Sequence, residues 1–278
     1  MRSWKLFPKE SSVAKYVDCY WFLEKNQEDV SFERPKLNPD PAAHLILAET
    51  QQRYRYSQGA NSFEGHGNHW MFPHCKTIEI DHSKPFLIVG IKFHVGALYS
   101  LKFSASQEVL DQVIDIDIRK LFQSDLFVAT DVLSDAINTP QICRDKLDNF
   151  IKPQLLECYE DKHSELVRRS LKLLSSTSIC NIGAALHCSQ RTIERSFLKV
   201  TGFTLKQCHS MNRLESILEY LYQLDSKRID WADIAAHFQF SDQPHLIRYL
   251  KSTIVVTPGE YARQRDLAID IYGNFEGA

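Results

Sequence analysis

The sequence lacks several features that would assign it to a class at once. No apolar run approaches the ~20 residues of a membrane-spanning helix, and a run such as Phe86 to Ile91 is far shorter. The first residues reach the charged pair Lys9-Glu10 before an apolar segment can form, so we expect no signal peptide. The seven cysteines form no Cys-x-x-Cys pair, which favours buried, reduced thiols. We therefore expect a cytoplasmic protein with no membrane partner.

The common catalytic motifs are also missing. The sequence contains no phosphate-binding glycine loop, no serine nucleophile elbow and no zinc-protease helix. Its apolar fraction of 44% and charged fraction of 24% are those of an ordinary folded protein, which excludes a disordered or collagen-like chain. We expect one or two domains in 278 residues, no enzymatic activity and no required cofactor.

The chain also has little net charge, because its 33 Lys and Arg residues nearly balance its 35 Asp and Glu residues. The near-neutral total hides an uneven distribution along the chain. Residues 165–265 hold 14 basic and nine acidic residues, a charge of +5, whereas residues 1–164 sum to −4 and the residues after 265 to −3. A basic segment is what contact with nucleic-acid phosphates requires, so the total charge does not exclude such a partner.

The two parts of the chain differ in pattern. Residues 16–23, 44–48, 77–81 and 86–93 have the apolar or alternating pattern of strands, and glycines such as Gly59, Gly65 and Gly67 are typical breakers between them. From about residue 96 the apolar spacing becomes helical. We predict an α+β protein. It has a β-rich, barrel-like domain at 1–160 with a helical C-terminal part, an all-α domain at 161–268, and an acidic tail at 269–278.

A pattern occurs twice within the basic segment. Ile182-Gly-Ala-Ala-Leu186 leads to Ile193, Arg195 and Phe197, and Ile234-Ala-Ala-His-Phe238 leads to Leu246, Arg248 and Leu250. In each copy a short helix with small alanines precedes a cap, Ser189 or Ser241-Asp242, which can begin a second helix. These parts predict two helix-turn-helix units at 179–200 and 231–252, joined by a helix from about Gln207 to Leu224.

The second helix of each unit presents polar side chains once its apolar residues are buried. The first unit would present Gln190, Arg191, Thr192, Glu194 and Arg195, and the second Gln243, Pro244, His245, Ile247 and Arg248. Arginine can bind guanine and glutamine can bind adenine with two hydrogen bonds each in the major groove of DNA. Pro244 falls in the first turn of its helix, where a missing N–H costs nothing. The sequence therefore favours double-stranded DNA as the partner.

Residues 170 to 265 resemble the DNA-binding domain of the AraC/XylS family of bacterial transcription regulators. The resemblance depends on the two alanine-rich helices, on Ser189-Gln-Arg-Thr-Ile-Glu-Arg-Ser-Phe197, and on Phe240-Ser-Asp-Gln243 followed by Thr257-Pro-Gly-Glu-Tyr261. It implies recognition helices in successive major-groove segments about 34 Å apart. It assigns base contacts to Gln190, Arg191, Glu194, Arg195, Gln243, Pro244, His245 and Arg248. Phosphate contacts are expected at Ser189, Thr192, Lys199, Lys206, Ser241 and Lys251.

Three positions depart from the family pattern. His187 and Gln239 stand where family members usually have glycine between the two helices of a unit, and Val255 also replaces a glycine. If the two turns need a positive φ, histidine tolerates it better than glutamine. Because Pro244 and Ile247 offer no hydrogen-bond donor, we expect the first unit to carry more sequence specificity than the second.

The N-terminal part resembles, more weakly, the β-rich domain that precedes this module in some family members. Tyr16-Val-Asp-Cys-Tyr-Trp-Phe22, Asn38-Pro-Asp-Pro41 and Val89-Gly-Ile-Lys-Phe93 with Gly96 carry this resemblance. It implies a regulatory domain that senses a small-molecule effector or forms a homodimer, in an activator that contacts RNA polymerase. Five aromatic residues of this part are expected in the core or on a dimer surface, with an apolar ligand pocket as the alternative: Trp4, Trp21, Trp70, Tyr54 and Tyr56.

Two rival hypotheses remain. In the first, His66, His69 and His74 bind a metal such as zinc, nickel or iron, and the N-terminal domain is a metal-dependent enzyme or metal sensor attached to a DNA-binding module. No Asp or Glu lies among these three histidines, so solvated or hydrogen-bonded imidazoles are the commoner outcome. In the second, the helical domain binds another protein, and its binding would then be insensitive to salt.

Overall fold

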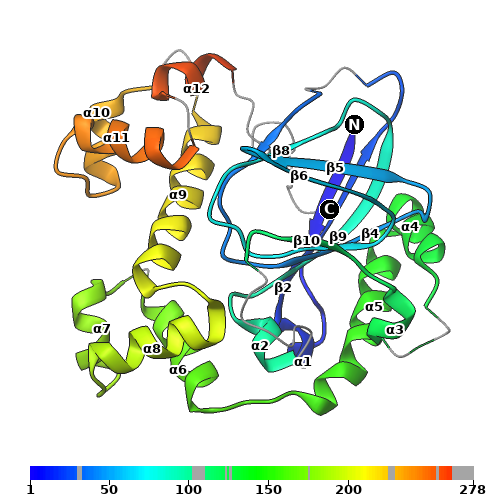
Figure 1. Cartoon of the computed structure of the whole chain (residues 1–278), viewed down its shortest axis with the longest axis horizontal. Helices are drawn as coiled ribbons and strands as arrows, with labels where there is room; N and C mark the ends of the chain where they lie inside the picture. The colour runs from blue at the N-terminus through cyan, green and yellow to red at the C-terminus, as the bar shows by residue number, and fades with distance from the viewer. Residues whose placement is uncertain are drawn as a thin grey trace.

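The computed structural model describes residues 1–29, 33–101, 110–122, 124, 127–174, 176–224, 229–254 and 257–264. Strands fill the N-terminal part, and helices make up the C-terminal part beside it (Figure 1). The predicted α+β class is confirmed. The predicted domain boundary near residue 160 stays a prediction, and Val255 and the acidic tail lie outside the described residues.

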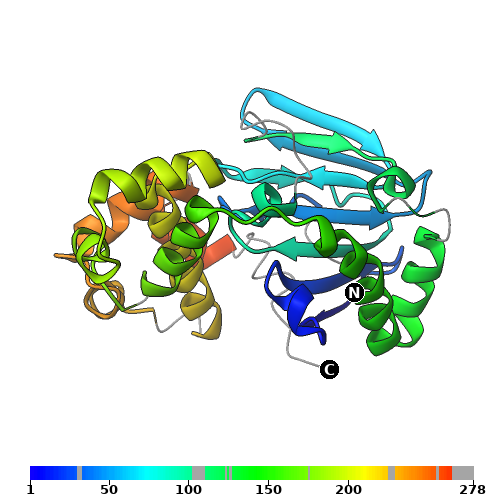
Figure 2. The ribbon, with the colours of Figure 1, turned by 90° about the horizontal axis from the view of Figure 1, so that it is seen from below.

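The described strands form two sheets. The six-stranded sheet has the order β1-β2-β9-β4-β7-β10: Arg2–Leu6, Val17–Lys25, Phe86–Phe93, His44–Ala48, His69–Met71 and Val113–Asp115. The four-stranded sheet has the order β3-β8-β5-β6: Lys36–Leu37, Ile78–Ile80, Arg53–Gln58 and Asn61–His66. The described strands pair antiparallel within each sheet, and no strand pairing joins the two sheets. The described strands therefore form a pair of sheets and not a closed barrel. Figure 2 shows the strands layered above one another from a second side.

Helices cover one side of the six-stranded sheet. They are α1 (Ser11–Ala14), α2 (Ala97–Leu101), α3 (Ile118–Phe122), α4 (Ala129–Asn138), α5 (Pro140–Ile151) and the 3₁₀ helix η1 (Lys152–Glu157). The buried carboxylate of Asp148 in α5 accepts hydrogen bonds from the Tyr20 hydroxyl at 2.6 Å and from the backbone N–H of Lys9 at 2.8 Å. Because a buried charge needs such partners, Asp148 fixes α5 against β2.

The C-terminal helices are arranged along one long helix. They are α6 (Lys162–Leu173), α7 (Ile179–Ala185), α8 (Gln190–Thr201), α9 (Leu205–Gln223), α10 (Trp231–His237), α11 (Gln243–Ile254) and α12 (Pro258–Gln264). In Figure 1, α6, α7 and α8 lie at one end of α9, and α10, α11 and α12 lie at the other. The first half of α9 buries Leu205, Cys208 and Met211 in one apolar cluster, and the second half buries Leu214 and its followers in another. Each unit therefore has its own core, and α9 belongs to both.

The strand predictions are partly confirmed. The segments 44–48 and 86–93 are β4 and β9, while 16–23 and 77–81 contain most of β2 and all of β8. Gly59 and Gly67 lie between strands with positive φ angles of 62° and 73°, as expected of breakers, but the prediction was wrong for Gly65, which lies inside β6. All seven cysteines lie in the described residues and are free thiols, and burial raises the pKa of Cys143 to about 12.

Candidate DNA-binding surface and adjoining cavity

The first helix-turn-helix unit consists of α7 and α8. The Ser189 hydroxyl accepts a hydrogen bond from the Thr192 N–H at 3.1 Å and so caps α8. Between the helices His187 has a φ of 53°, in the left-handed region. A Cβ at Gly183 would lie 2.8 Å from the Cys188 carbonyl oxygen, so glycine is needed where the turn folds back on α7. The turn thus fixes the angle at which α8 leaves α7.

The second unit repeats this geometry in α10 and α11. The Asp230 carboxylate caps α10 by accepting a hydrogen bond from the Ala232 N–H at 2.9 Å. Gln239 has a φ of 57°, at the position equivalent to His187. The Asp242 carboxylate accepts a hydrogen bond from the His245 N–H at 2.6 Å, and Pro244 stands in the first turn of α11 as predicted. Two of the three departures from the family pattern, His187 and Gln239, therefore fall on left-handed backbone.

The apolar positions of the repeat anchor both second helices. Ile193 and Phe197 of α8 are fully buried, as are Leu246 and Leu250 of α11. Arg213 of α9 supports the second unit, since its guanidinium lies 3.7 Å from the centre of the Phe240 ring and donates a hydrogen bond to the Phe238 carbonyl. Packing of this kind leaves the opposite faces of α8 and α11 to solvent.

Six of the eight predicted base readers are exposed: Arg191, Arg195, Gln243, Pro244, His245 and Arg248. Gln190 and Glu194 are half-buried and are engaged with their own domain. The Gln190 amide donates to Glu194 Oε1 at 3.2 Å, and Glu194 Oε2 accepts from the Leu205 N–H at 3.3 Å. Glu194 thus stabilises the connection between α8 and α9. Its contact with a DNA base stays a prediction.

The predicted phosphate contacts divide in a similar way. Lys206 and Lys251 are exposed, and Ser189 and Ser241 stand at the beginnings of the two second helices. The hydroxyls of Ser189 and Thr192 lie 2.8 Å apart. Lys199 instead forms an ion pair with Asp161 at 3.2 Å, next to the ring of Tyr99. Its contact with DNA, like those of the other five, stays a prediction.

A partly open cavity of about 230 Å³ lies where the two sheets meet α9. Strand residues of both sheets form most of its wall, and Glu215, Leu218 and Glu219 of α9 form the rest. Trp21 of β2 forms part of the wall and pairs with Gly90 of β9. The Trp21 indole packs over Gly90, because a Cβ added to Gly90 would lie only 1.9 Å from the indole. Of the five aromatic residues singled out in the sequence, Trp21 and Tyr56 line this cavity, while Trp4 and Trp70 are buried in the main core.

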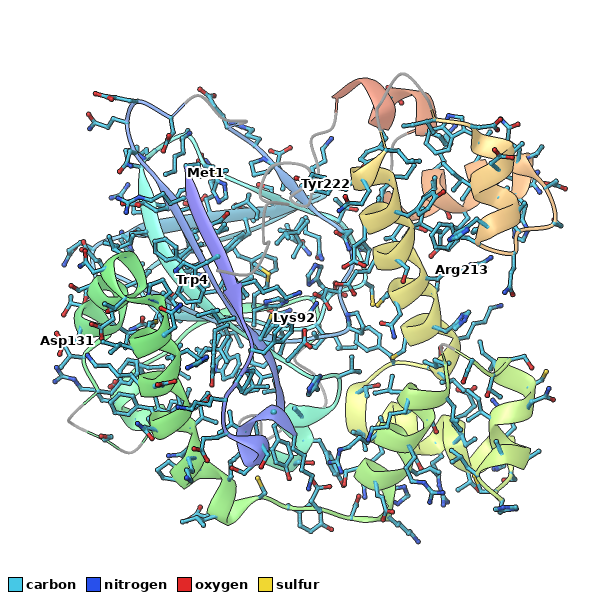
Figure 3. All side chains as sticks on the ribbon, turned by 180° about the vertical axis from the view of Figure 1, so that it is seen from behind. Met1, Trp4, Lys92, Asp131, Arg213 and Tyr222 are labelled. Carbon is cyan, nitrogen blue, oxygen red and sulfur yellow. The ribbon has the colours of Figure 1, made fainter. Side chains whose placement is uncertain are left out.

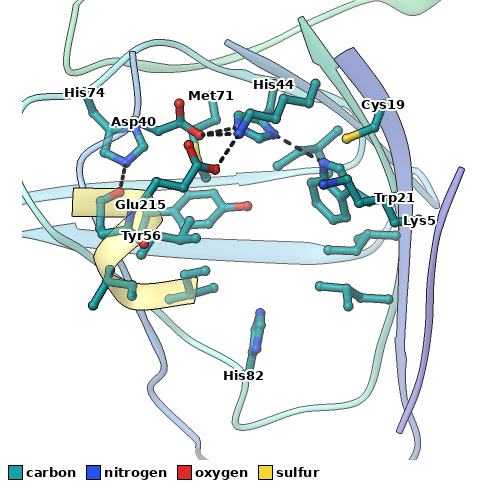
Figure 4. A pocket seen from close by; sticks show the side chains of 18 of the residues that line it. Lys5, Cys19, Trp21, Asp40, His44, Tyr56, Met71, His74, His82 and Glu215 are labelled. Carbon is teal, nitrogen blue, oxygen red and sulfur yellow. Dashed lines mark hydrogen bonds and ion pairs between the residues drawn. The ribbon is translucent and has the colours of Figure 1, made fainter. Parts of the chain in front are cut away.

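A chain of hydrogen bonds and ion pairs crosses one side of the cavity, with His82 on the other (Figure 4). The Trp21 N–H donates to His44 Nδ1 at 3.2 Å, since an indole nitrogen can only donate. His44 Nε2 lies 3.2 Å from the Asp40 carboxylate. Lys92 lies 3.3 Å from Asp40 and 3.1 Å from Glu215 of α9. Figure 3 shows Lys92 between the strands and α9.

Charge and burial set the protonation of this cluster. Burial opposes both charges, but Lys92 holds the pKa of Asp40 well below its usual range, and Asp40 and Glu215 hold the pKa of Lys92 above its own. Burial, together with the nearby charge of Lys25, lowers the pKa of His82 to about 3. Burial and the neighbouring Glu215 raise the pKa of Glu219. The Lys92 pair therefore persists at neutral pH, and His82 is uncharged there.

The three histidines of the metal hypothesis do not converge. His66 is exposed on β6, where its Nε2 accepts a hydrogen bond from Arg53 at 3.1 Å. His69 Nε2 bonds to the Tyr56 hydroxyl at 2.8 Å and Nδ1 to the Gly67 carbonyl at 2.8 Å. His74 bonds to the Asn38 carbonyl at 3.0 Å. Within the described residues no group of three His, Cys, Asp or Glu is placed to hold a metal ion, so the structure does not support the hypothesis of a metal enzyme or sensor.

Two capped helix pairs with exposed second helices, held on one shared helix, define a DNA-binding protein of the helix-turn-helix class. Residues 182–264 match a family model described as a helix-turn-helix domain, and residues 6–115 match a domain of unknown function, DUF6597. This match confirms the resemblance of the C-terminal part to the AraC-type helix-turn-helix domain, and that domain supports a DNA-binding transcription regulator. No curated protein matches the chain. No helix in the described part of the chain is long and apolar enough to cross a bilayer.

Several solved structures resemble the chain at low identity. ToxT from Vibrio cholerae O395 is 12% identical, with a TM-score of 0.45 and coverage of 87% of this chain and 97% of ToxT. ToxT from Vibrio cholerae strain SCE256 with a bound unsaturated fatty acid is 11% identical, with a TM-score of 0.43, and 89% and 96% of the chains are covered. The AraC-like transcriptional activator CuxR is 9% identical, with a TM-score of 0.28 and coverage of 78% and 86%.

Proposed function

We propose that this protein is an effector-responsive transcription activator that inserts α8 and α11 into successive major-groove segments of one DNA site. The observation that carries the proposal is the placement of two exposed recognition helices at opposite ends of one helix. The 19 residues of α9 span about 28 Å at ~1.5 Å per residue. Such a spacer matches the ~34 Å repeat of the major groove once the recognition helices extend beyond its ends.

The response to an effector is proposed from the position of the cavity. Its wall includes Glu215, Leu218 and Glu219 of α9, the helix that belongs to the cores of both units. A molecule that fills this space touches the element that spaces the two recognition helices. A ligand shifts the populations of two arrangements of α9 only if it binds one arrangement more tightly than the other. We extend the proposal to a cytoplasmic location, contact with RNA polymerase, and a homodimer formed through residues 1–164.

Selection of binding sites from random DNA with the full-length protein tests the regulator directly. The base-reading role of Arg195 is then tested on the selected site. We expect Arg195→Ala to weaken binding there by about 1–3 kcal/mol, with a smaller loss on random DNA, because arginine discriminates bases through paired hydrogen bonds. Arg119→Ala, an exposed arginine of α3, is the matched control and should change neither affinity.

Two outcomes would contradict the proposal. An equal loss on selected and random DNA would assign Arg195 to phosphate contact and not to base readout. Failure to enrich any site, together with salt-insensitive capture of a protein by the helical domain, would favour the protein-interaction hypothesis. A selected site with one element implies a single bound copy, whereas a repeated element implies the homodimer.

A further inference from the structure

The charges around the cavity between the sheets and α9 are unbalanced. Lys5 and Lys92 face three carboxylates, those of Asp40, Glu215 and Glu219. Burial keeps the imidazoles of His74 and His82 uncharged by lowering their pKa values. Among the lysines and carboxylates of the wall there is one more negative than positive group.

The excess negative charge lies on α9. Lys92 is already shared between Asp40 and Glu215, at 3.3 and 3.1 Å. Glu219, one turn further along α9, is exposed and forms no ion pair with a described Lys or Arg, although the charges of Lys5 and Lys92 act on it from further away. A ligand carboxylate would add to the carboxylates already around Lys92, whereas a ligand cation would meet Glu219 and Glu215 without displacing Lys92.

The rest of the wall suits the body of a small aromatic molecule. Trp21 and Tyr56 come from different sheets, and the side chains between them are apolar: Leu23, Leu37, Ile46, Met71, Ile80 and Ile88. Aromatic faces attract cations that lie over them. A cavity of ~150 Å³ holds benzene, so about 230 Å³ holds roughly nine non-hydrogen atoms.

We propose that this cavity binds a small organic cation, an aromatic amine of roughly nine non-hydrogen atoms, with its ring between Trp21 and Tyr56 and its ammonium at Glu219 and Glu215. The inference rests on the proposed effector response, since it names the chemical class of the effector. The amine neutralises carboxylates of α9 next to the Lys92–Glu215 ion pair, which joins β9 to that helix. Occupancy of the cavity thereby changes the contacts that position α9.

Three probes of similar size and different charge test the ligand class. They are 2-phenylethylamine, the neutral 2-phenylethanol and the anionic benzoate, each titrated into the full-length protein by calorimetry at pH 7. We expect the amine to bind at least tenfold more tightly than the alcohol, and the carboxylate to bind more weakly than the alcohol. Equal affinity for all three, tightest binding of the carboxylate, or no binding of any probe would overturn the proposal.

Two variants locate the bound charge. Glu219→Gln keeps the size of the side chain, so the amine should lose its tenfold advantage while the affinity for the alcohol stays the same. Glu165→Gln, an exposed glutamate of α6 away from the cavity, is the matched control and should leave the advantage intact. An advantage that survives Glu219→Gln would overturn the placement of the ammonium.

A separate measurement distinguishes failure of this inference from failure of the proposed function. DNA affinity of the full-length protein is measured with and without saturating amine on a selected site. Sequence-specific DNA binding without any amine binding would support the proposed DNA-binding function and overturn the proposed ligand class. Charge-selective amine binding that leaves DNA affinity unchanged supports the ligand site and overturns the proposed effector response.

Discussion

The left-handed backbone at Gln239 is a measurable source of strain. Its φ of 57° is an angle that glycine adopts freely and that a residue with a Cβ adopts only at a cost. The Gln239 side chain is exposed, and the backbone N–H already donates to the Ala236 carbonyl at 3.0 Å. Gln239→Gly therefore removes the strain of the turn without removing a buried contact.

The expected gain follows from two opposing terms. Relief of the left-handed conformation contributes about 1–2 kcal/mol. The greater freedom of glycine in the unfolded chain takes back about 0.4–1 kcal/mol. The free energy of opening the second unit should rise by about 0.5–1 kcal/mol, which lowers its opening constant about two- to fivefold.

Hydrogen exchange followed by mass spectrometry measures this effect where it occurs. The buried amides of α10 and α11 should exchange two- to fivefold more slowly in Gln239→Gly, while amides of α7 and α8 keep their rates. Gln239→Ala is the control, because alanine keeps a Cβ and the strain and should change stability by less than about 0.5 kcal/mol. Equal slowing by Ala and Gly would refute the assignment to backbone strain.

Three further results are expected. Gly90→Ala should lower the free energy of unfolding in urea by about 1–3 kcal/mol, because a Cβ would stand 1.9 Å from the Trp21 indole, and unchanged stability would contradict that packing. Burial alone would raise the pKa of Glu160, but hydrogen bonds from its neighbours bring it down to about 2 from 4.5. The wild type should therefore lose stability relative to Glu160→Gln as the pH falls from 4.5 to 2, and parallel curves would argue against this role. Lys251→Ala should reduce the slope of log affinity against log salt by about 1 on selected and random DNA alike, and an unchanged slope would exclude a phosphate contact.

Patterns that are local in sequence translated directly into structure. The segments 44–48 and 86–93 were predicted as strands because a continuous apolar run is typical of a strand buried on both faces, and they are β4 and β9 in the structure. The two helix-turn-helix units were predictable for the same reason, since caps, alanines and anchors all lie within twenty residues of one another. Even the strain at His187 and Gln239 could be expected from the missing glycines.

Features that depend on contacts between distant strands were not predictable in this way. Glycine usually breaks a strand, yet Gly65 lies in β6. Glycine occupies this position because a Cβ would lie 2.4 Å from the Tyr54 hydroxyl of the paired strand. The cluster of Asp40, Lys92 and Glu215 joins positions that no spacing rule connects. A signal was nevertheless present, since the three N-terminal motifs that resemble the family domain each contribute to the cavity.

The sharing of α9 has a consequence for building hybrid regulators. Lys92 of β9 forms an ion pair with Glu215 at the centre of α9, Lys199 of α8 lies over the ring of Tyr99 in α2, and the Thr77 hydroxyl donates to the Thr253 carbonyl of α11. A hybrid cut near residue 160 would leave each N-terminal part facing a helix with foreign charges. Transfer of the proposed effector response to another DNA specificity therefore requires the cavity-facing positions of α9 to travel with the N-terminal part, while α8 and α11 stay behind.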